Sequence, residues 1–180
     1  MTTMRNLIRI VENQSRVSEI VIDKAAKLAR RLSWSEDGAL DVFNTLRDAG
    51  YVGPEYNVDT PEFTEAFVKW SKDEVEASLD EITQLFKNDK LRVWREITAP
   101  VDWKPSGHPG LYWSWEKDAA EAHWGDGEGV KWLLEATVTF DQIDWVETLG
   151  RNASTSYNDE KEIRVLASAD VKLEHWGRVR

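Results

Sequence analysis

Three absences bound what this chain of 180 residues is. It has no cysteine, which excludes disulfides, thiolate nucleophiles and zinc sites built on cysteine. It has no apolar run near the roughly 18 residues that span a bilayer, so we expect no membrane segment. Its first residues do not resemble a signal peptide, because Arg9 and Glu12 interrupt the apolar stretch there. We therefore expect a cytoplasmic protein, or one that is delivered into a host cell.

The chain also has fewer basic than acidic residues. Lys and Arg number 23 against 33 Asp and Glu, a formal net charge of -10. A general nucleic-acid binder is disfavoured, because phosphate binding needs concentrated Lys and Arg. A basic protein partner, or mimicry of nucleic acid, fits the charge. The three histidines are spread over separate segments and no metal-ligand spacing is present, so we expect no bound metal.

The first half of the chain has the period of amphipathic helices, with apolar residues at three- and four-residue steps. Thr60 is a good N-cap, and Pro61 suits the first helical position that follows it. The last helix is either one long helix or two helices broken near Ser71. The pattern predicts helices over residues 17–32, 36–50 and 61–87.

From residue 91 the period changes to two, which is typical of half-buried strands. A short helix over 116–124 and a turn or helical turn over 141–149 interrupt the strands. We therefore predict an α+β fold, with a helical N-terminal segment (1–88) followed by a compact, mainly antiparallel β domain (89–180). The predicted strands cover residues 91–97, 110–115, 130–140, 160–167 and 170–176.

Two polar residues fall at unexpected places in these strands. Arg95 shares a strand face with three aliphatic residues, and a buried unpaired charge costs several kcal/mol. An internal ion pair, a strand end open to solvent, or an anionic ligand would each satisfy it. Ser114 is a small hydroxyl between Trp113 and Trp115, where it either fills space or does chemistry.

A pair of carboxylates opens the fourth predicted strand. Residues two apart in a strand point the same way, roughly 7 Å from each other. Glu160 and Glu162 would therefore project together, with Ile163 and Val165 turned into the core. The pair is either the solvated face of a strand or a functional pair of carboxylates.

The order of these features resembles the mono-ADP-ribosyltransferases of the bacterial-toxin type, which carry an Arg, a Ser-Thr-Ser and a Glu-x-Glu motif. "VWRE" around Arg95 is similar to the first motif and "LYWSWEKDAAEAHWG" to the second, although only Ser114 of its three positions is kept. "EKEIRVL" is similar to the third motif. The literal "STS" at 154–156 lies in a polar loop close to Glu160, and we do not assign it as the motif.

The resemblance implies an ADP-ribosyltransferase-like core that binds NAD as co-substrate, without a metal. Glu162 would stabilise the positive charge that builds on the ribose as the nicotinamide bond breaks. Ser114 would orient Glu162, and Arg95 would hold a diphosphate oxygen or the adjoining ribose. Trp94 and Trp113 would stack on a ring of the dinucleotide, with packing in the core as the alternative.

The acceptor side rests on the same resemblance. Glu160 would position or deprotonate the acceptor, most simply an arginine on a basic protein, and Tyr157 would contact that target. A nucleic-acid acceptor stays open, and the setting would be a bacterial or phage toxin-like effector. Two other functions are compatible with the sequence: a non-catalytic acidic interaction or inhibitor protein, and an NAD glycohydrolase on the same fold.

Overall fold

A computed structural model of the chain describes residues 15–122, 129–157 and 160–179. The chain forms two compact units. The helical unit contains residues up to Leu85 together with the segment that begins at Trp145 and runs to 157. The sheet unit contains Phe86–Asp144 and the residues from 160 onward. The segment at 145–157, which follows three of the strands in sequence, is thus part of the helical unit.

The helical unit contains α2 (Glu19–Glu36), α3 (Gly38–Asp48), α4 (Pro61–Leu85) and α6 (Trp145–Asn152). The predicted start of α4 is confirmed, since Thr60 Oγ1 accepts a hydrogen bond of 3.1 Å from the Phe63 amide. The helix then runs unbroken through Ser71. Side chains of α3 and the first half of α4 form an aromatic core: Val42, Phe43, Leu46, Phe63, Phe67 and Trp70.

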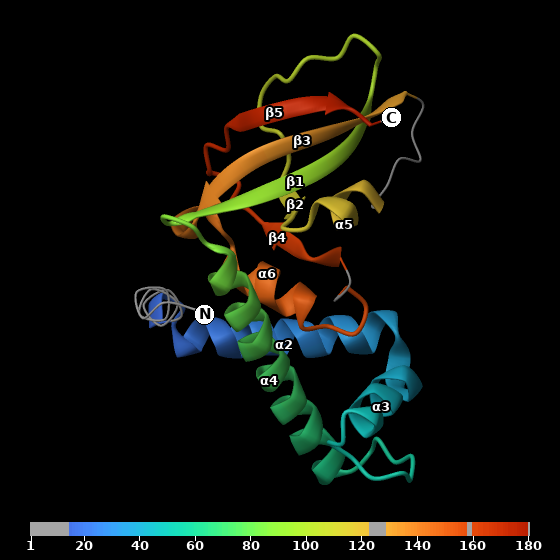
Figure 1. Ribbon diagram of the computed structural model, residues 1–180. Coiled ribbons are helices and arrows are strands. Elements are labelled where there is room, and N and C mark those ends of the chain that lie inside the picture. The colour runs from blue at the N-terminus through green and yellow to red at the C-terminus, as the bar shows by residue number, and fades with distance from the viewer. Residues whose placement is uncertain (1–14, 123–128, 158–159, 180) are drawn as a thin grey trace, which may run out of the picture. The chain divides into compact units, whose positions relative to one another are not determined.

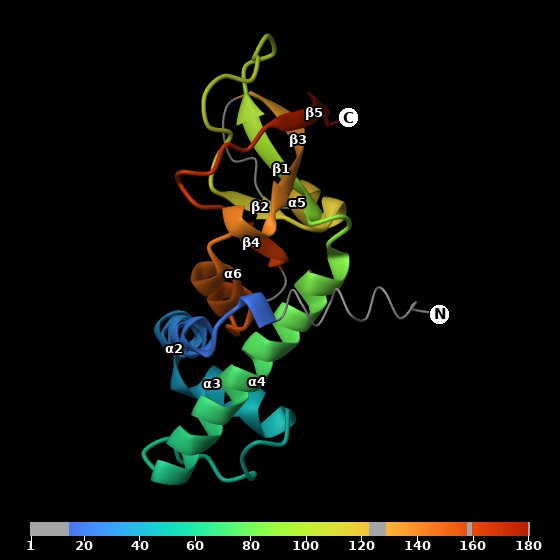
Figure 2. The same ribbon diagram turned by 90° about the vertical axis from the view of Figure 1, so that its left-hand side faces the viewer.

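Helix α6 lies along α2, and small residues let the two approach closely (Figures 1 and 2). A Cβ at Gly150 would lie 2.8 Å from Leu28 Cδ2, closer than side-chain carbons pack. Helix α2 also contains three fully or almost fully buried alanines: Ala25, Ala26 and Ala29. Behind α6, Thr155 and Ser156 donate hydrogen bonds to Asp37 at the end of α2. The "STS" segment is therefore built into this unit as a structural loop.

The sheet unit has five antiparallel strands in the order β4-β2-β1-β3-β5 (Figure 1). The long pair, β1 with β3, matches residue for residue from Lys90 opposite Thr139 to Ala99 opposite Val130. Alternate residues of β3 are buried, as the period of two predicts, whereas in β1 this alternation holds only as far as Val93 and is followed by buried Glu96 and Ala99. The elements of the unit are β1 (Lys90–Ala99), β2 (Tyr112–Ser114), α5 (Lys117–Ala122), β3 (Val130–Thr139), the 3-10 turn η1 (Phe140–Gln142), β4 (Glu162–Arg164) and β5 (Leu173–Arg178).

A tight two-residue turn leads into β1. Asn88 and Asp89 have φ of 52° and 60°, the left-handed values that such a hairpin turn needs, and Lys87 and Lys90 exchange backbone hydrogen bonds across it. Just before the turn, the ring of Phe86 packs against Phe140 with centroids 5.7 Å apart. The turn thereby sets the residue at which β1 begins.

The predicted α+β class is confirmed, with helices and a five-stranded antiparallel sheet. The more specific ADP-ribosyltransferase-like arrangement stays a prediction. The helical turn expected over 141–149 is η1 followed by α6, and the strand expected over 160–167 is shortened to Glu162–Arg164. Among the helices that the structure describes, none combines the length and apolarity needed to cross a bilayer.

Candidate functional site in the sheet unit

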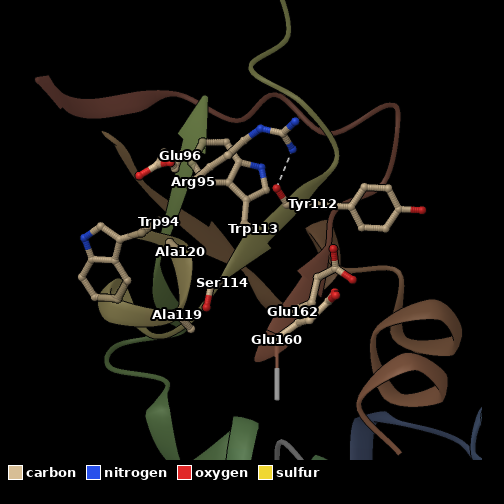
Figure 3. Close-up of a pocket in the computed structure, with 10 residues that line it drawn as sticks. All are labelled: Trp94, Arg95, Glu96, Tyr112, Trp113, Ser114, Ala119, Ala120, Glu160 and Glu162. Atoms are coloured by element: carbon tan, nitrogen blue, oxygen red, sulfur yellow. Dashed lines mark hydrogen bonds between the residues drawn. The ribbon is translucent and has the colours of Figure 1, made fainter. Parts of the chain in front are cut away.

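A hollow of about 270 Å³ opens beside strands β1, β2 and β4 (Figure 3). Six of the seven residues proposed for function from the sequence line it: Trp94, Arg95, Trp113, Ser114, Glu160 and Glu162. They come from three strands or strand ends that are separated by up to 68 positions in the chain. The hollow therefore gathers the aromatic-arginine, serine and glutamate motifs in one place.

The pairing of the strands places three residues of this site next to one another in a row across the sheet. Trp94 on β1 lies directly opposite Ser114 on β2, and Ser114 lies directly opposite Glu162 on β4. Cross-strand partners in an antiparallel sheet project from the same face, with Cβ atoms about 5 Å apart. Ser114 is 7% exposed, and its hydroxyl accepts a hydrogen bond of 3.1 Å from the Glu116 amide. Ser114 is thus held between an aromatic ring and a carboxylate.

The unexpected position of Arg95 is explained by its contacts. Its Nη1 donates a hydrogen bond of 2.6 Å to the Tyr112 carbonyl, and its Nε is buried without a hydrogen-bond partner among the described residues (Figure 3). Burial lowers the pKa of Arg95, and the nearby negative charge of Glu162 partly offsets that effect. The guanidinium keeps its charge, because arginine titrates far above neutral pH. A buried cation with an unused donor is suited to an anionic ligand.

A glycine in the loop before β2 packs directly on this guanidinium. Gly110 has φ of +109°, and a Cβ there would lie 2.6 Å from Arg95 Cζ. The loop is held on both sides, since Trp113 Nε1 donates to the Gly110 carbonyl at 3.0 Å and the Gly110 amide donates to His108 Nδ1 at 3.1 Å. Only glycine satisfies both the backbone angle and the close approach. Sequence reasoning missed Gly110, although the Gly-His-Pro-Gly run marks a turn.

The backbone conformation that brings the two glutamates to the hollow differs from the one predicted from the sequence. Lys161 between them has φ of +50°, so Glu160 precedes β4 instead of belonging to it. The predicted alignment of the pair by strand alternation is therefore wrong, because the left-handed Lys161 interrupts the alternation. Both side chains still line the hollow, and Figure 3 draws them side by side. The Lys161 carbonyl accepts a hydrogen bond of 3.0 Å from the Trp115 amide, which fixes this bend.

A third carboxylate in the lining has a structural partner. The side chain of Glu96 is 0% exposed, and Lys131 Nζ from the neighbouring strand lies 2.8 Å from its Oε1. Both of its carboxylate oxygens are buried and neither has a hydrogen-bond partner among the described residues, so the contact with Lys131 is an ion pair. Glu96 follows Arg95 directly and so projects from the opposite face of the strand, and its burial was not predicted from the sequence. Its pairing with Lys131 gives Glu96 a structural role, while Glu160 and Glu162 are the other two acids that line the hollow.

The remaining residues divide between the two units. Tyr112, Ala119 and Ala120 also line the hollow, and the two alanines show that α5 approaches it with small side chains. Tyr157, proposed to meet the target, is not among the lining residues. It belongs to the helical unit, where the Arg151 guanidinium lies 4.2 Å from the centroid of its ring.

The hollow combines one guanidinium, one hydroxyl and two carboxylates with aromatic walls. That set suits a polar ligand that carries an anionic group, hydroxyls and a flat ring. Comparison with protein-family models, with curated proteins and with solved structures found no match to this chain. The residues of the hollow are therefore the basis for assigning a function to this chain.

Proposed function

We propose that this protein is a mono-ADP-ribosyltransferase, which cleaves NAD at the nicotinamide–ribose bond and transfers ADP-ribose to a guanidine group on a protein. The observation that carries the proposal is the convergence of Arg95, Ser114, Glu160 and Glu162 on one hollow. The order and spacing of these residues in the sequence also point to a shared site. A set of unrelated surface residues would not be expected to meet in one cavity.

The dimensions of the hollow limit which part of NAD enters it. Pockets that bury a whole drug-sized ligand measure about 300–1,000 Å³, and this one measures about 270 Å³. It is therefore suited to the nicotinamide and its ribose, with the rest of the dinucleotide lying outside. The buried Nε of Arg95, without a partner among the described residues, offers a donor for a phosphate at the mouth.

The roles of the side chains follow from the charge that develops. Breaking the nicotinamide–ribose bond builds positive charge on the sugar, and a preorganised carboxylate stabilises it. Glu162 lies in strand register with Ser114, which would hold it in place from the neighbouring strand. Glu160, outside the strand, would face the acceptor and help remove its proton. Trp94 would offer a flat surface at the far end of the row, while Trp113 is 2% exposed and serves mainly as core.

Nicotinamide release from NAD tests the proposal directly. Wild-type protein should release nicotinamide and label agmatine, a small guanidine. Glu162→Gln should reduce release by about 10²–10³-fold, the range seen when one preorganised electrostatic group is removed. Glu160→Gln should depress labelling of agmatine more than release of nicotinamide. The matched control is Glu174→Gln, an exposed glutamate of β5 that does not line the hollow.

The outcomes separate three functions. Nicotinamide release that depends on Glu162, without labelling of agmatine or of any protein in a lysate, would assign an NAD glycohydrolase instead. No release by wild-type protein, or equal release by Glu162→Gln and wild type, would end the enzyme proposal. The non-catalytic interaction protein would then be the better interpretation of the acidic chain.

A further inference from the structure

The helical unit contains a second and larger hollow, which the proposed chemistry does not use. This groove of about 550 Å³ runs between α2 and the first half of α4. Its floor consists of Phe63 and Phe67, which are also part of the aromatic core. The ring of Trp34 stands over them, 6.4 Å and 6.3 Å from their centroids. Trp34 and Val68 are each 44% exposed, so apolar surface faces outward here.

The charge of the groove is opposite to that of the protein. The chain carries -10, yet the two charged residues of the lining are both arginines, Arg30 and Arg31. Arg30 Nη1 donates to Ser71 Oγ at 2.7 Å, and burial lowers the pKa of Arg30. Arg31, one residue on, is exposed. An acidic ligand would find here a local positive rim on an otherwise acidic surface.

We propose that this groove binds an acidic amphipathic helix of a partner protein, with apolar side chains on Trp34, Phe63 and Phe67 and a carboxylate paired with Arg31. Two helices that flank an open apolar groove are the usual platform for a third helix, whose apolar residues recur at three- and four-residue steps. Exposed aromatic and arginine side chains are also the residue types that dominate binding energy at protein interfaces. The fit of charge selects an acidic helix over a basic one.

The assignment is independent of the NAD chemistry. All residues of the groove belong to the helical unit, and all residues of the NAD hollow belong to the sheet unit. A variant of the groove should therefore keep its nicotinamide release. Loss of partner binding and loss of NAD cleavage can be separated in one preparation.

Random peptides of roughly 16 residues, about four helical turns, displayed on phage are the probe. They are selected on the full-length protein, with counter-selection on an Arg31→Glu variant. Selected sequences should place apolar residues at three- and four-residue steps and contain Asp or Glu. By fluorescence anisotropy, the best peptide should bind Arg31→Glu at least about tenfold more weakly, a difference of about 1.4 kcal/mol. Trp34→Ala should weaken binding by a similar or larger factor.

Lys24→Glu is the matched control, since it makes the same charge reversal on an exposed residue of α2, about 10 Å along the helix from Arg31. It should bind the peptide as wild type does, and circular dichroism should show all variants folded. Recovery of no peptide, recovery of basic peptides, or equal affinity for Arg31→Glu and Lys24→Glu would overturn the proposal. A wild-type dimer in solution that Trp34→Ala converts to monomer would instead assign the groove to a second copy of this chain.

Discussion

A single methyl group at Gly110 tests whether the loop before β2 positions Arg95. In Gly110→Ala the new Cβ would lie 2.6, 2.7 and 2.9 Å from Arg95 Cζ, Nη1 and Nε. Carbon atoms do not approach other heavy atoms so closely, so either the guanidinium or the loop must move. The backbone adds strain of its own, because φ of +109° is disfavoured for any residue with a Cβ.

The cost divides into two parts. A left-handed backbone costs about 1–2 kcal/mol for a residue other than glycine. Overpacking against a fixed neighbour adds about 1–3 kcal/mol, and the lower entropy of the unfolded alanine chain returns about 0.4–1 kcal/mol. We expect Gly110→Ala to lower the free energy of unfolding by about 2–4 kcal/mol. Gly107→Ala should cost about 1 kcal/mol, since its φ is +71° but nothing lies within 4 Å of its added Cβ.

Urea unfolding followed by circular dichroism measures both variants, and the excess of Gly110→Ala over Gly107→Ala reports the contact with Arg95. The excess should disappear when the same change is made in an Arg95→Ala background, as a double-mutant cycle requires. In the NAD assay, Gly110→Ala should raise KM more than it lowers kcat, because in the proposed mechanism Arg95 holds a phosphate away from the bond that breaks. Equal costs at the two glycines, or an excess that survives Arg95→Ala, would refute the reasoning.

Three further predictions concern stability. Lys161→Val should lower the free energy of unfolding by about 1–2 kcal/mol, because a β-branched residue disfavours φ of +50°. Lys161→Gly should change the free energy of unfolding by less than about 1 kcal/mol, and thermal or urea unfolding measures both variants. The Tyr51 hydroxyl donates a hydrogen bond of 2.7 Å to the Asp73 carboxylate, which raises the pKa of Tyr51 from 10.0 to about 12. The resulting stabilisation of the fold is complete below pH 10 and is lost between pH 10 and 12, so Tyr51→Phe should lose less stability than wild type over that range. Lys131→Ala should lower the free energy of unfolding by about 1–3 kcal/mol, because it leaves the buried Glu96 carboxylate unpaired. The double variant Lys131→Ala, Glu96→Gln should recover part of this loss. No recovery would show that the ion pair is not the cause.

Much of the fold was predictable, because local signals agreed with the final environment. The period of three and four placed α2, α3 and α4, and Thr60 marked the start of α4 within one residue. The period of two placed β1 and β3, which pair residue for residue along their length. Short elements were harder to predict: β2 and β4 are three residues each, too short for a period to define their ends.

Six of the seven residues proposed from the sequence line one hollow, but the backbone geometry that brings them there was not predicted. Arg95 was found because a charge on an apolar face needs a partner, which is a signal in the sequence alone. The bend at Lys161 carries no such signal, because lysine has no preference for a left-handed backbone. Gly110 and the burial of Glu96 depend on atoms brought together from distant strands, and no single strand pattern contains that information.

The closure of α6 on α2 constrains how this protein is made and dissected. Leu28 and its alanine neighbours leave the ribosome more than 100 residues before Gly150, and the Thr155 amide finds the Ser33 hydroxyl across 122 positions. During translation the face of α2 that α6 covers therefore stays exposed to solvent until most of the sheet has been synthesised. A fragment of residues 1–88 would expose that face permanently, and a fragment of 89–180 would carry α6 with its own apolar face unmatched. Neither fragment is expected to fold as an independent domain when expressed alone.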